Sequence, residues 1–148
     1  MIYNKQPNNF IPDIKVVGCL VELEGKILLL HRHNNKSQGG KWGIPAGKID
    51  KEDKEDKDEK SAILRELREE TGLILNEDDL VFHKTFFVEY PDKKYFYHYH
   101  KTELKEKVDI IIEKNEHQDF AWVTLEEALN MPLITHEDHC LKDYYGIK

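Results

Sequence analysis

The segment that most constrains the fold of this chain is the run from Arg65 to Leu73, which reads RELREETGL. With about 100° of rotation per helical residue, the carboxylates of Glu66, Glu69 and Glu70 fall within an arc of roughly 100°. Three aliphatic side chains fall on a different arc, which can face a core: Ile63, Leu64 and Leu67. The run therefore predicts an amphipathic helix that carries a stripe of acids.

Three acids on one stripe repel one another unless a cation lies among them. Clustered oxygen ligands suit a hard divalent ion such as Mg²⁺ or Mn²⁺, which in turn suits phosphate chemistry. The loop before the helix can add a backbone carbonyl, for which we select Ala46, and Arg65 can pair with a neighbouring acid and orient it. A purely structural helix with i,i+4 ion pairs is the alternative, but it does not explain the glycine-bearing segment that precedes the helix.

Composition limits the class of protein. The chain has 148 residues, 39% of them apolar, which suffices for the core of one domain spanning residues 1–148. A formal charge of −7 argues against binding to a nucleic-acid polymer. The two cysteines form no disulfide framework, and no signal peptide or membrane span is visible. We expect a cytoplasmic monomer or homodimer without a membrane partner.

The first half of the chain predicts a hairpin and two loops. Residues 14–23 and 26–31 are apolar strands joined by a turn at Glu24-Gly25. Residues 33–40 suit an exposed loop, and residues 42–49 suit short extended backbone.

A charge run follows in residues 50–60, with seven acids and four lysines. It predicts a solvated loop that enters the helix. A calcium-binding loop is excluded because the run has no glycine for the sharp turn. Asp56 with Glu59 can cap the helix, and Gly72 fits its left-handed end.

The second half predicts more strands and two short helices. We expect strands at residues 80–90, 94–104, 108–112 and 120–123. On the second strand, Tyr95, Tyr97 and Tyr99 alternate with Phe96, His98 and His100. A helix follows Thr124, whose box with Glu127 is an N-cap signal, and Thr135-x-x-Asp138 suggests a last helix.

The acidic helix and its lead-in resemble the Nudix box, the pattern G-x5-E-x7-R-E-U-x-E-E-x-G-U, in which U is a bulky aliphatic residue. Gly47 matches the opening glycine, and the closing portion from Arg65 to Leu73 matches without a gap. The flanking phrases WGIPAGKID and FAWVTLEEAL are also similar to family segments. One departure is an insertion of four residues, which puts Lys57 at the place of the early glutamate. Glu55, Asp56 or Asp58 could substitute for it.

The resemblance implies an α/β fold, an α/β/α sandwich with a central mixed β-sheet. It also implies metal-dependent hydrolysis of a pyrophosphate linkage in a nucleoside diphosphate derivative, either a nucleoside triphosphate or an ADP-ribose-like nucleotide sugar. Carried over by position, Glu66, Glu69 and Glu70 hold the metal and Arg65 orients the cluster. The general base is a box glutamate or a later carboxylate, here Glu116 with Asp119 as fallback.

Substrate choice lies outside the box. Trp42, Tyr97 or Tyr99 could stack a base, Arg32 or Lys48 could meet phosphate, and Gly47 is a further candidate for substrate binding. For the aromatic residues, core packing is the alternative. His98 and His100 could be a transition-metal pair, but without a third ligand we expect exposed or cleft-lining histidines. A nucleotide-sensing module that does not turn over is the rival function.

Overall fold

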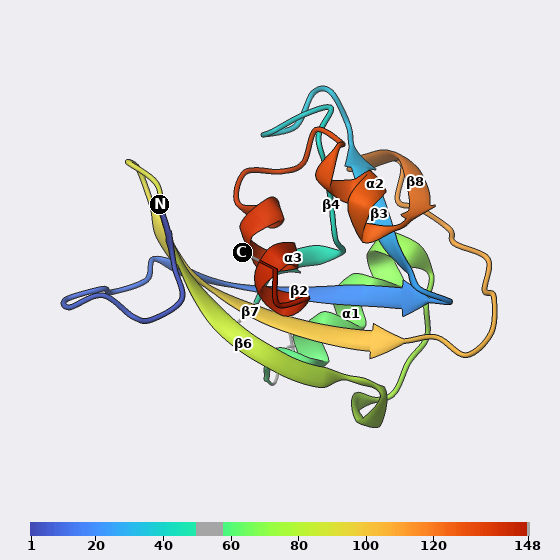
Figure 1. Ribbon diagram of the computed structural model, residues 1–148, viewed down its shortest axis with the longest axis horizontal. Coiled ribbons are helices and arrows are strands. Elements are labelled where there is room, and N and C mark those ends of the chain that lie inside the picture. The colour runs from blue at the N-terminus through green and yellow to red at the C-terminus, as the bar shows by residue number, and fades with distance from the viewer. Residues whose placement is uncertain (50–57, 148) are drawn as a thin grey trace.

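One mixed β-sheet of eight strands organises the described part of the chain, residues 1–49 and 58–147 of a computed structural model (Figure 1). Its hydrogen-bonded path runs β1-β6-β7-β2-β3-β4, with β5 paired to β2 and β8 paired to β3. The strands are β1 Ile2–Tyr3, β2 Ile14–Leu23, β3 Lys26–Arg32, β4 Trp42–Gly43, β5 Ala46–Lys48, β6 Val81–Glu89, β7 Lys94–Glu103 and β8 His117–Val123.

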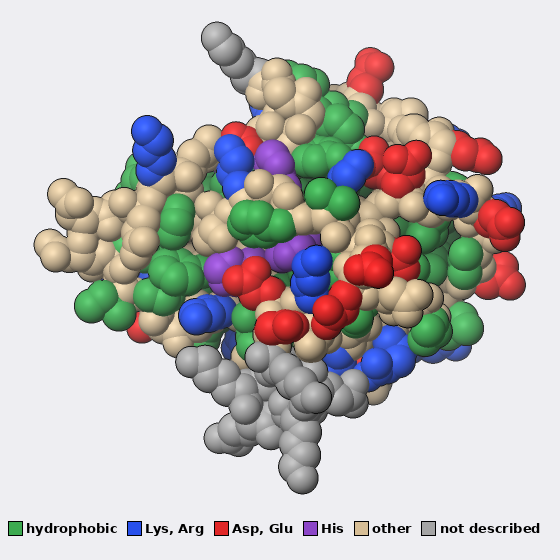
Figure 2. Space-filling view, turned by 90° about the horizontal axis from the view of Figure 1, so that it is seen from below, with side chains coloured by type: hydrophobic (Ala, Val, Ile, Leu, Met, Phe, Trp, Pro, Cys, Tyr) green, Lys and Arg blue, Asp and Glu red, His purple; other side chains and the backbone are tan. Residues whose placement is uncertain are grey.

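Helices cover both faces of this sheet (Figure 1). α1 spans Glu59–Thr71, α2 spans Leu125–Leu129, α3 spans Glu137–Tyr144, and a 3₁₀ turn spans Glu77–Asp79. Among the described residues, no helix has both the length and the apolar character needed to cross a bilayer. On the face seen in Figure 2, acidic and basic side chains are interspersed.

The alternation of side chains along the strands creates two core layers. On β2, Val17, Cys19 and Val21 pack toward α1, whereas Leu20 packs toward α3. β7 lies parallel to β2 and follows the same alternation, so that Tyr97 and Tyr99 face α3. Burial of both faces of β2 and β3 explains the apolar density of the first predicted hairpin.

The histidines of β7 are buried rather than exposed. His98 and His100 are 7% and 2% exposed. Their Nε2 atoms lie 3.4 and 3.9 Å from the Glu59 carboxylate at the start of α1. The expectation of exposed or cleft-lining histidines is therefore wrong, because the first turn of α1 covers this part of the sheet.

The structure corrects the predicted caps of two helices. Asp58 is the N-cap of α1, where its Oδ1 accepts from the Ser61 N–H at 2.8 Å; the predicted cap Asp56 lies outside the described residues. His136, not Thr135, precedes α3, and its side chain makes no capping bond. Gly72 ends α1 with φ of 76°, and Thr124 caps α2, both as predicted.

The predicted strand at residues 108–112 is absent; this segment has no regular structure. The Ile111 N–H donates to the Thr71 carbonyl at 2.8 Å, and Ile110 and Ile112 pack against the α1 core. The apolar side chains of this segment are thus buried where it crosses the C-terminal end of α1, and not by pairing with the sheet.

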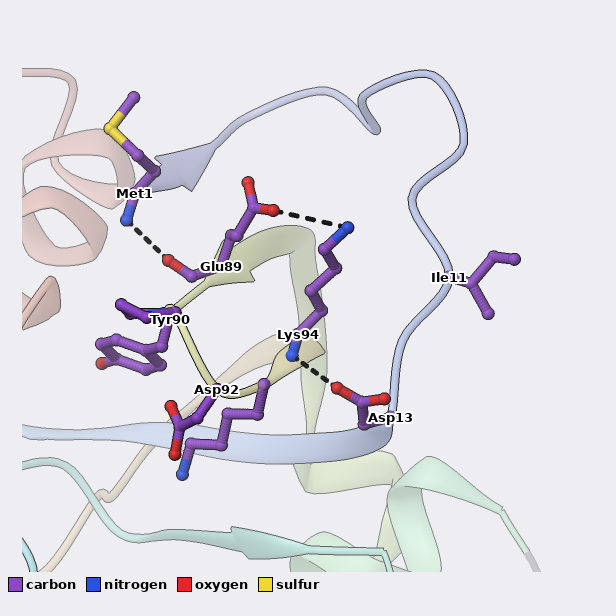
Figure 3. Close-up of a pocket in the computed structure, with 9 residues that line it drawn as sticks. Met1, Ile11, Asp13, Glu89, Tyr90, Asp92 and Lys94 are labelled. Carbon is purple, nitrogen blue, oxygen red and sulfur yellow. Dashed lines mark hydrogen bonds and ion pairs between the residues drawn. The ribbon is translucent and has the colours of Figure 1, made fainter.

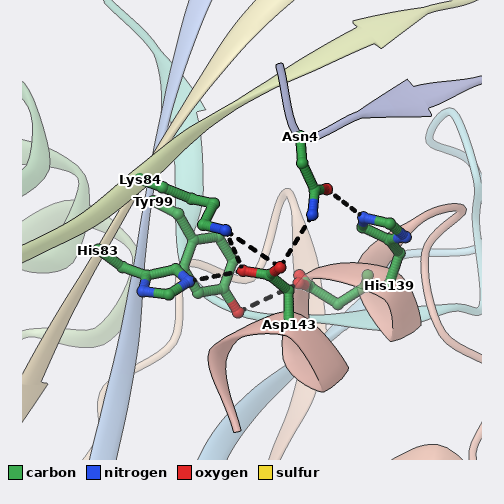
Figure 4. Close-up of polar contacts among 7 residues, drawn as sticks. Asn4, His83, Lys84, Tyr99, His139 and Asp143 are labelled. Atoms are coloured by element: carbon green, nitrogen blue, oxygen red, sulfur yellow. Dashed lines mark hydrogen bonds and ion pairs between the residues drawn. The ribbon is translucent and has the colours of Figure 1, made fainter. Parts of the chain in front are cut away.

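Asp143 anchors α3 to β6 and to the segment after β1 (Figure 4). Its carboxylate accepts from His83 Nε2 at 2.9 Å, from Lys84 Nζ at 2.8 Å and from Asn4 Nδ2 at 3.0 Å. The three donors come from β6 and from the segment after β1, so one acid holds three distant parts of the chain together.

Candidate active site

The carboxylate of Glu66 lies directly against the backbone of β5. A Cβ atom at Gly47 would overlap this carboxylate, so a larger residue at position 47 would displace it. Gly47 is paired with Val17 of β2, which fixes its position. The opening glycine of the box therefore has a steric reason: it lets α1 approach the strand closely.

Arg65 is the buried cation of this cluster. Its Nη1 lies 3.0 Å from Glu66 Oε1 and 3.0 Å from Glu69 Oε2, and its Nη2 donates to the Lys48 carbonyl at 3.2 Å. The Glu69 side chain is 51% exposed and lies at the outer side of the arginine. Arg65 therefore pairs with both acids, and its bond to the Lys48 carbonyl ties α1 to β5.

Glu70 is the most deeply buried of the three box acids. It is 4% exposed, and its Oε2 accepts from the Ala46 N–H at 3.1 Å. Burial raises the pKa of Glu70 well above its usual value, and Glu66 and Glu116 raise it further. Burial likewise raises the pKa of Glu66 to about 7. Two acids held in this way are stabilised as carboxylates by a bound cation.

Glu116 and His117 join Glu70 from the other side of the site. One oxygen of each carboxylate and a ring nitrogen of His117 all lie within 4.8 Å of one another. A shift of register between β3 and β8 pairs Arg32 with His117 at this point. Burial lowers the pKa of His117 to about 4, so its imidazole is neutral. These oxygen and nitrogen donors can hold a divalent cation.

Two cavities lie beside this cluster. The first, the polar cavity, has a volume of about 520 Å³ and five charged residues in its lining, which consists of Arg32, Ala46, Gly47, Lys48, Ile49, Arg65, Glu66 and Glu116. The second, of about 130 Å³, is mainly apolar, with a lining of Val16, Ile44, Ala46, Val88, Tyr95, Tyr97, Ile134, Thr135, His136 and Glu137. Ala46 of β5 belongs to the lining of both cavities.

Glu137 is the buried acid of the apolar cavity. It is 5% exposed, accepts from the Ile44 N–H at 3.2 Å and accepts from the Tyr99 hydroxyl at 3.4 Å. Burial raises its pKa to about 7. Sequence reasoning missed this residue, as it missed His117 beside Glu116, because neither belongs to a recognisable motif.

The predicted substrate residues separate into two groups. Arg32 and Lys48 line the polar cavity and Tyr97 lines the apolar one. Trp42 instead stacks on His31, with ring centroids 4.2 Å apart and an interplanar angle of 2°. The Asp119 carboxylate accepts from the adjacent Phe120 N–H.

A larger cleft of about 620 Å³ lies away from these acids, between the N-terminal segment and the β6–β7 turn (Figure 3). Its sides are joined by bonds from the Met1 amino group to the Glu89 carbonyl and from the Lys94 N–H to Asp13. No residue of α1 or β5 is among its described lining residues. Its size alone therefore does not make it the active site.

Comparison with known proteins agrees with this geometry. The family model of the NUDIX domain matches residues 12–144. The chain belongs to the NUDIX family. It is 29% identical over 135 residues to the CTP pyrophosphohydrolase of Escherichia coli strain K12, a match that covers 91% of this chain and 93% of the relative.

Solved structures show the same Nudix fold. The MutT protein of Methanosarcina mazei Go1 superposes with a TM-score of 0.75 at 26% identity, over 90% of this chain and 93% of the other. The NUDIX domain of Shewanella oneidensis NrtR, crystallised with ADP ribose, gives 0.78 at 21% identity, over 97% and 93%. The predicted α/β sandwich is confirmed, and the protein is a Nudix pyrophosphohydrolase, a hydrolase of acid anhydrides.

Proposed function

We propose that this protein hydrolyses a phosphoanhydride bond of a nucleoside triphosphate in a reaction that requires Mg²⁺ or Mn²⁺. The observation that carries the proposal is that Ala46 lines two unlike cavities. The polar cavity, with acids and arginines, suits a metal-bound triphosphate, and the apolar cavity suits a base. A nucleotide that spans both would place its anhydride bonds beside the box acids.

Glu70 and Glu116 are the proposed carboxylate ligands of the ion, with the carbonyl of Ala46 as a backbone ligand. The donor set fits a hard divalent ion, because the two carboxylates lie within 4.8 Å of each other and one of them is buried. When bound, such an ion neutralises phosphate oxygens and lowers the pKa of water. Glu69, exposed at the outer side of Arg65, contributes negative charge rather than a direct ligand.

Glu66 is the proposed general base. Its pKa of about 7 suits acceptance of a proton from water near neutral pH, and it lines the polar cavity. Arg65, 3.0 Å from its carboxylate, holds it in one orientation. Arg32 and Lys48 line the same cavity and are placed to balance the charge of the phosphates.

The apolar cavity has a size that suits a pyrimidine base. Its volume of about 130 Å³ is well below the roughly 300 Å³ at which pockets for drug-sized ligands begin, so a single ring is the better match. Tyr97 offers an aromatic wall of this cavity, and Glu137 offers a polar group in the same lining. The similarity to a CTP pyrophosphohydrolase supports the same class of substrate.

An activity panel tests this function. The four nucleoside triphosphates, an oxidised purine triphosphate, ADP-ribose and a dinucleoside polyphosphate are incubated with Mg²⁺ or Mn²⁺, and released phosphate, pyrophosphate and nucleoside monophosphate are measured. We expect a pyrimidine triphosphate to have the highest kcat/KM and chelation of the ion to abolish turnover. Tight nucleotide binding without any hydrolysis would instead identify a sensing module.

A further inference from the structure

His117 occupies an unusual place for a buried histidine, beside the two carboxylates proposed to bind the ion. It is 4% exposed and begins β8 directly after Glu116. A ring nitrogen lies within 4.8 Å of a carboxylate oxygen of Glu70 and of one of Glu116. The imidazole and the two acids therefore face a common point.

A second observation also points to a missing partner. The Nδ1 atom of His117 is buried and has no hydrogen-bond partner among the residues that the structure describes. A buried polar atom without a partner costs roughly 1–3 kcal/mol, so such atoms are uncommon in folded proteins unless a ligand or water meets them. The hydrogen bonds of the protein itself thus leave this ring available.

We propose that His117 is a direct ligand of the divalent ion, and that this nitrogen makes the centre favour Mn²⁺ over Mg²⁺. This inference rests on the proposed function, which puts the ion between Glu70 and Glu116. Imidazole is a better ligand for first-row transition ions than for Mg²⁺, which prefers oxygen donors. A carboxylate pair alone would discriminate less between the two ions.

The decisive measurement detects nitrogen on the metal and does not use catalysis. Mn²⁺ alone is added to the full-length protein, and pulsed electron paramagnetic resonance records hyperfine coupling from directly bound nitrogen. We expect a ¹⁴N coupling that becomes a ¹⁵N coupling when the histidines are ¹⁵N-labelled. Bound Mn²⁺ without this coupling would overturn the proposal, and so would Mn²⁺ that stays free at millimolar concentration.

Two variants assign the signal to one residue. His117→Gln keeps a polar side chain of similar length, and it should lose the nitrogen coupling. His33→Gln is the matched control, because His33 also has a buried Nδ1 without a partner among the described residues but lies outside the cluster. It should keep the coupling. A coupling that persists in His117→Gln would refute the assignment, and the wild-type spectrum remains a test if that variant does not fold.

Metal selectivity gives a second readout. His117→Gln should weaken Mn²⁺ binding by about tenfold or more while changing Mg²⁺ binding by less than about threefold. Equal losses for both ions would contradict a ligand role for the imidazole. If nitrogen coupling is present and no nucleotide is hydrolysed, the proposed function fails and this inference survives. If hydrolysis occurs without the nitrogen coupling, this inference fails and the proposed function survives.

Discussion

The two faces of the sheet bury acids in different ways. On the α1 face, Glu66 and Glu70 are buried beside each other, and Arg65 is the buried cation that pairs with the first. On the α3 face, Glu137 is buried alone among apolar and aromatic side chains, with both oxygens hydrogen-bonded. The first arrangement concentrates charge and favours a cation, whereas the second can accommodate a neutral acid.

In the proposed function, the two faces of the sheet would serve two parts of a nucleotide. Burial raises the pKa of Glu66 and of Glu137 to about 7, but only Glu66 lies in a polar cavity. The same pKa shift can therefore support proton transfer on one face and base binding on the other. Four predictions test the contrast.

The largest effect is expected on the α1 face. Glu70→Gln removes one charge from the proposed metal shell with little change in volume, and it should lower kcat by about 10³-fold or more. Circular dichroism should show an intact fold. Glu77→Gln, at an exposed acid of the 3₁₀ turn, is the control and should keep wild-type rates. Near-normal turnover of Glu70→Gln would remove this residue from the metal site.

A second variant separates the base from the ligands. Glu66→Gln should lower kcat by about 10²-fold or more, within the range known for general bases, while Mn²⁺ affinity changes little. Because a base must be ionised, and a bound cation favours the ionised form of Glu66, wild-type activity should rise with pH below about 7, and the variant should lack this rise. Loss of Mn²⁺ binding in Glu66→Gln would instead make Glu66 a ligand.

The apolar cavity can be tested by filling it. Ile134→Phe adds volume to its lining and should raise KM for the preferred triphosphate by about tenfold, with kcat changed less than about threefold. The same enlargement at Ile11, in the wide cleft near the N-terminus, is the matched control. An equal effect at both positions would show that the base does not bind beside Tyr97.

The smallest effect concerns stability. Glu137 has a folded pKa of about 7 against a usual value of 4.5, so the folded state holds a proton that the unfolded state loses between these pH values. The free energy of unfolding therefore falls as pH rises through this window. Glu137→Gln should be more stable than wild type at pH 8 by roughly 2 kcal/mol, and not at pH 4.

Denaturant unfolding at both pH values, without divalent ions, measures this difference. Glu77→Gln, at an exposed acid of the 3₁₀ turn, is the control and should leave the pH dependence unchanged. A wild-type and a Glu137→Gln protein with parallel pH profiles would show that the acid is not buried in solution.

Local patterns were sufficient for most elements of the fold. Alternation of side chains predicted β7. Gly72 marked the end of α1 through its left-handed backbone and Thr124 marked the start of α2 through a side-chain cap, and both signals depend only on neighbouring residues. The segment 108–112 failed because an apolar run can be buried by a strand or by a crossing loop, and its own residues do not distinguish the two.

The sequence by itself determined the family, the acidic helix α1 and the candidate chemistry, because these depend on residues spaced within one helix and one loop. Tertiary structure decided that Glu116 and His117 approach Glu70 and that Trp42 stacks on His31. It also brought Glu137 and Ala46 together in the lining of one cavity. Contacts between residues far apart in the chain depend on strand register and helix packing, which short-range spacing does not encode.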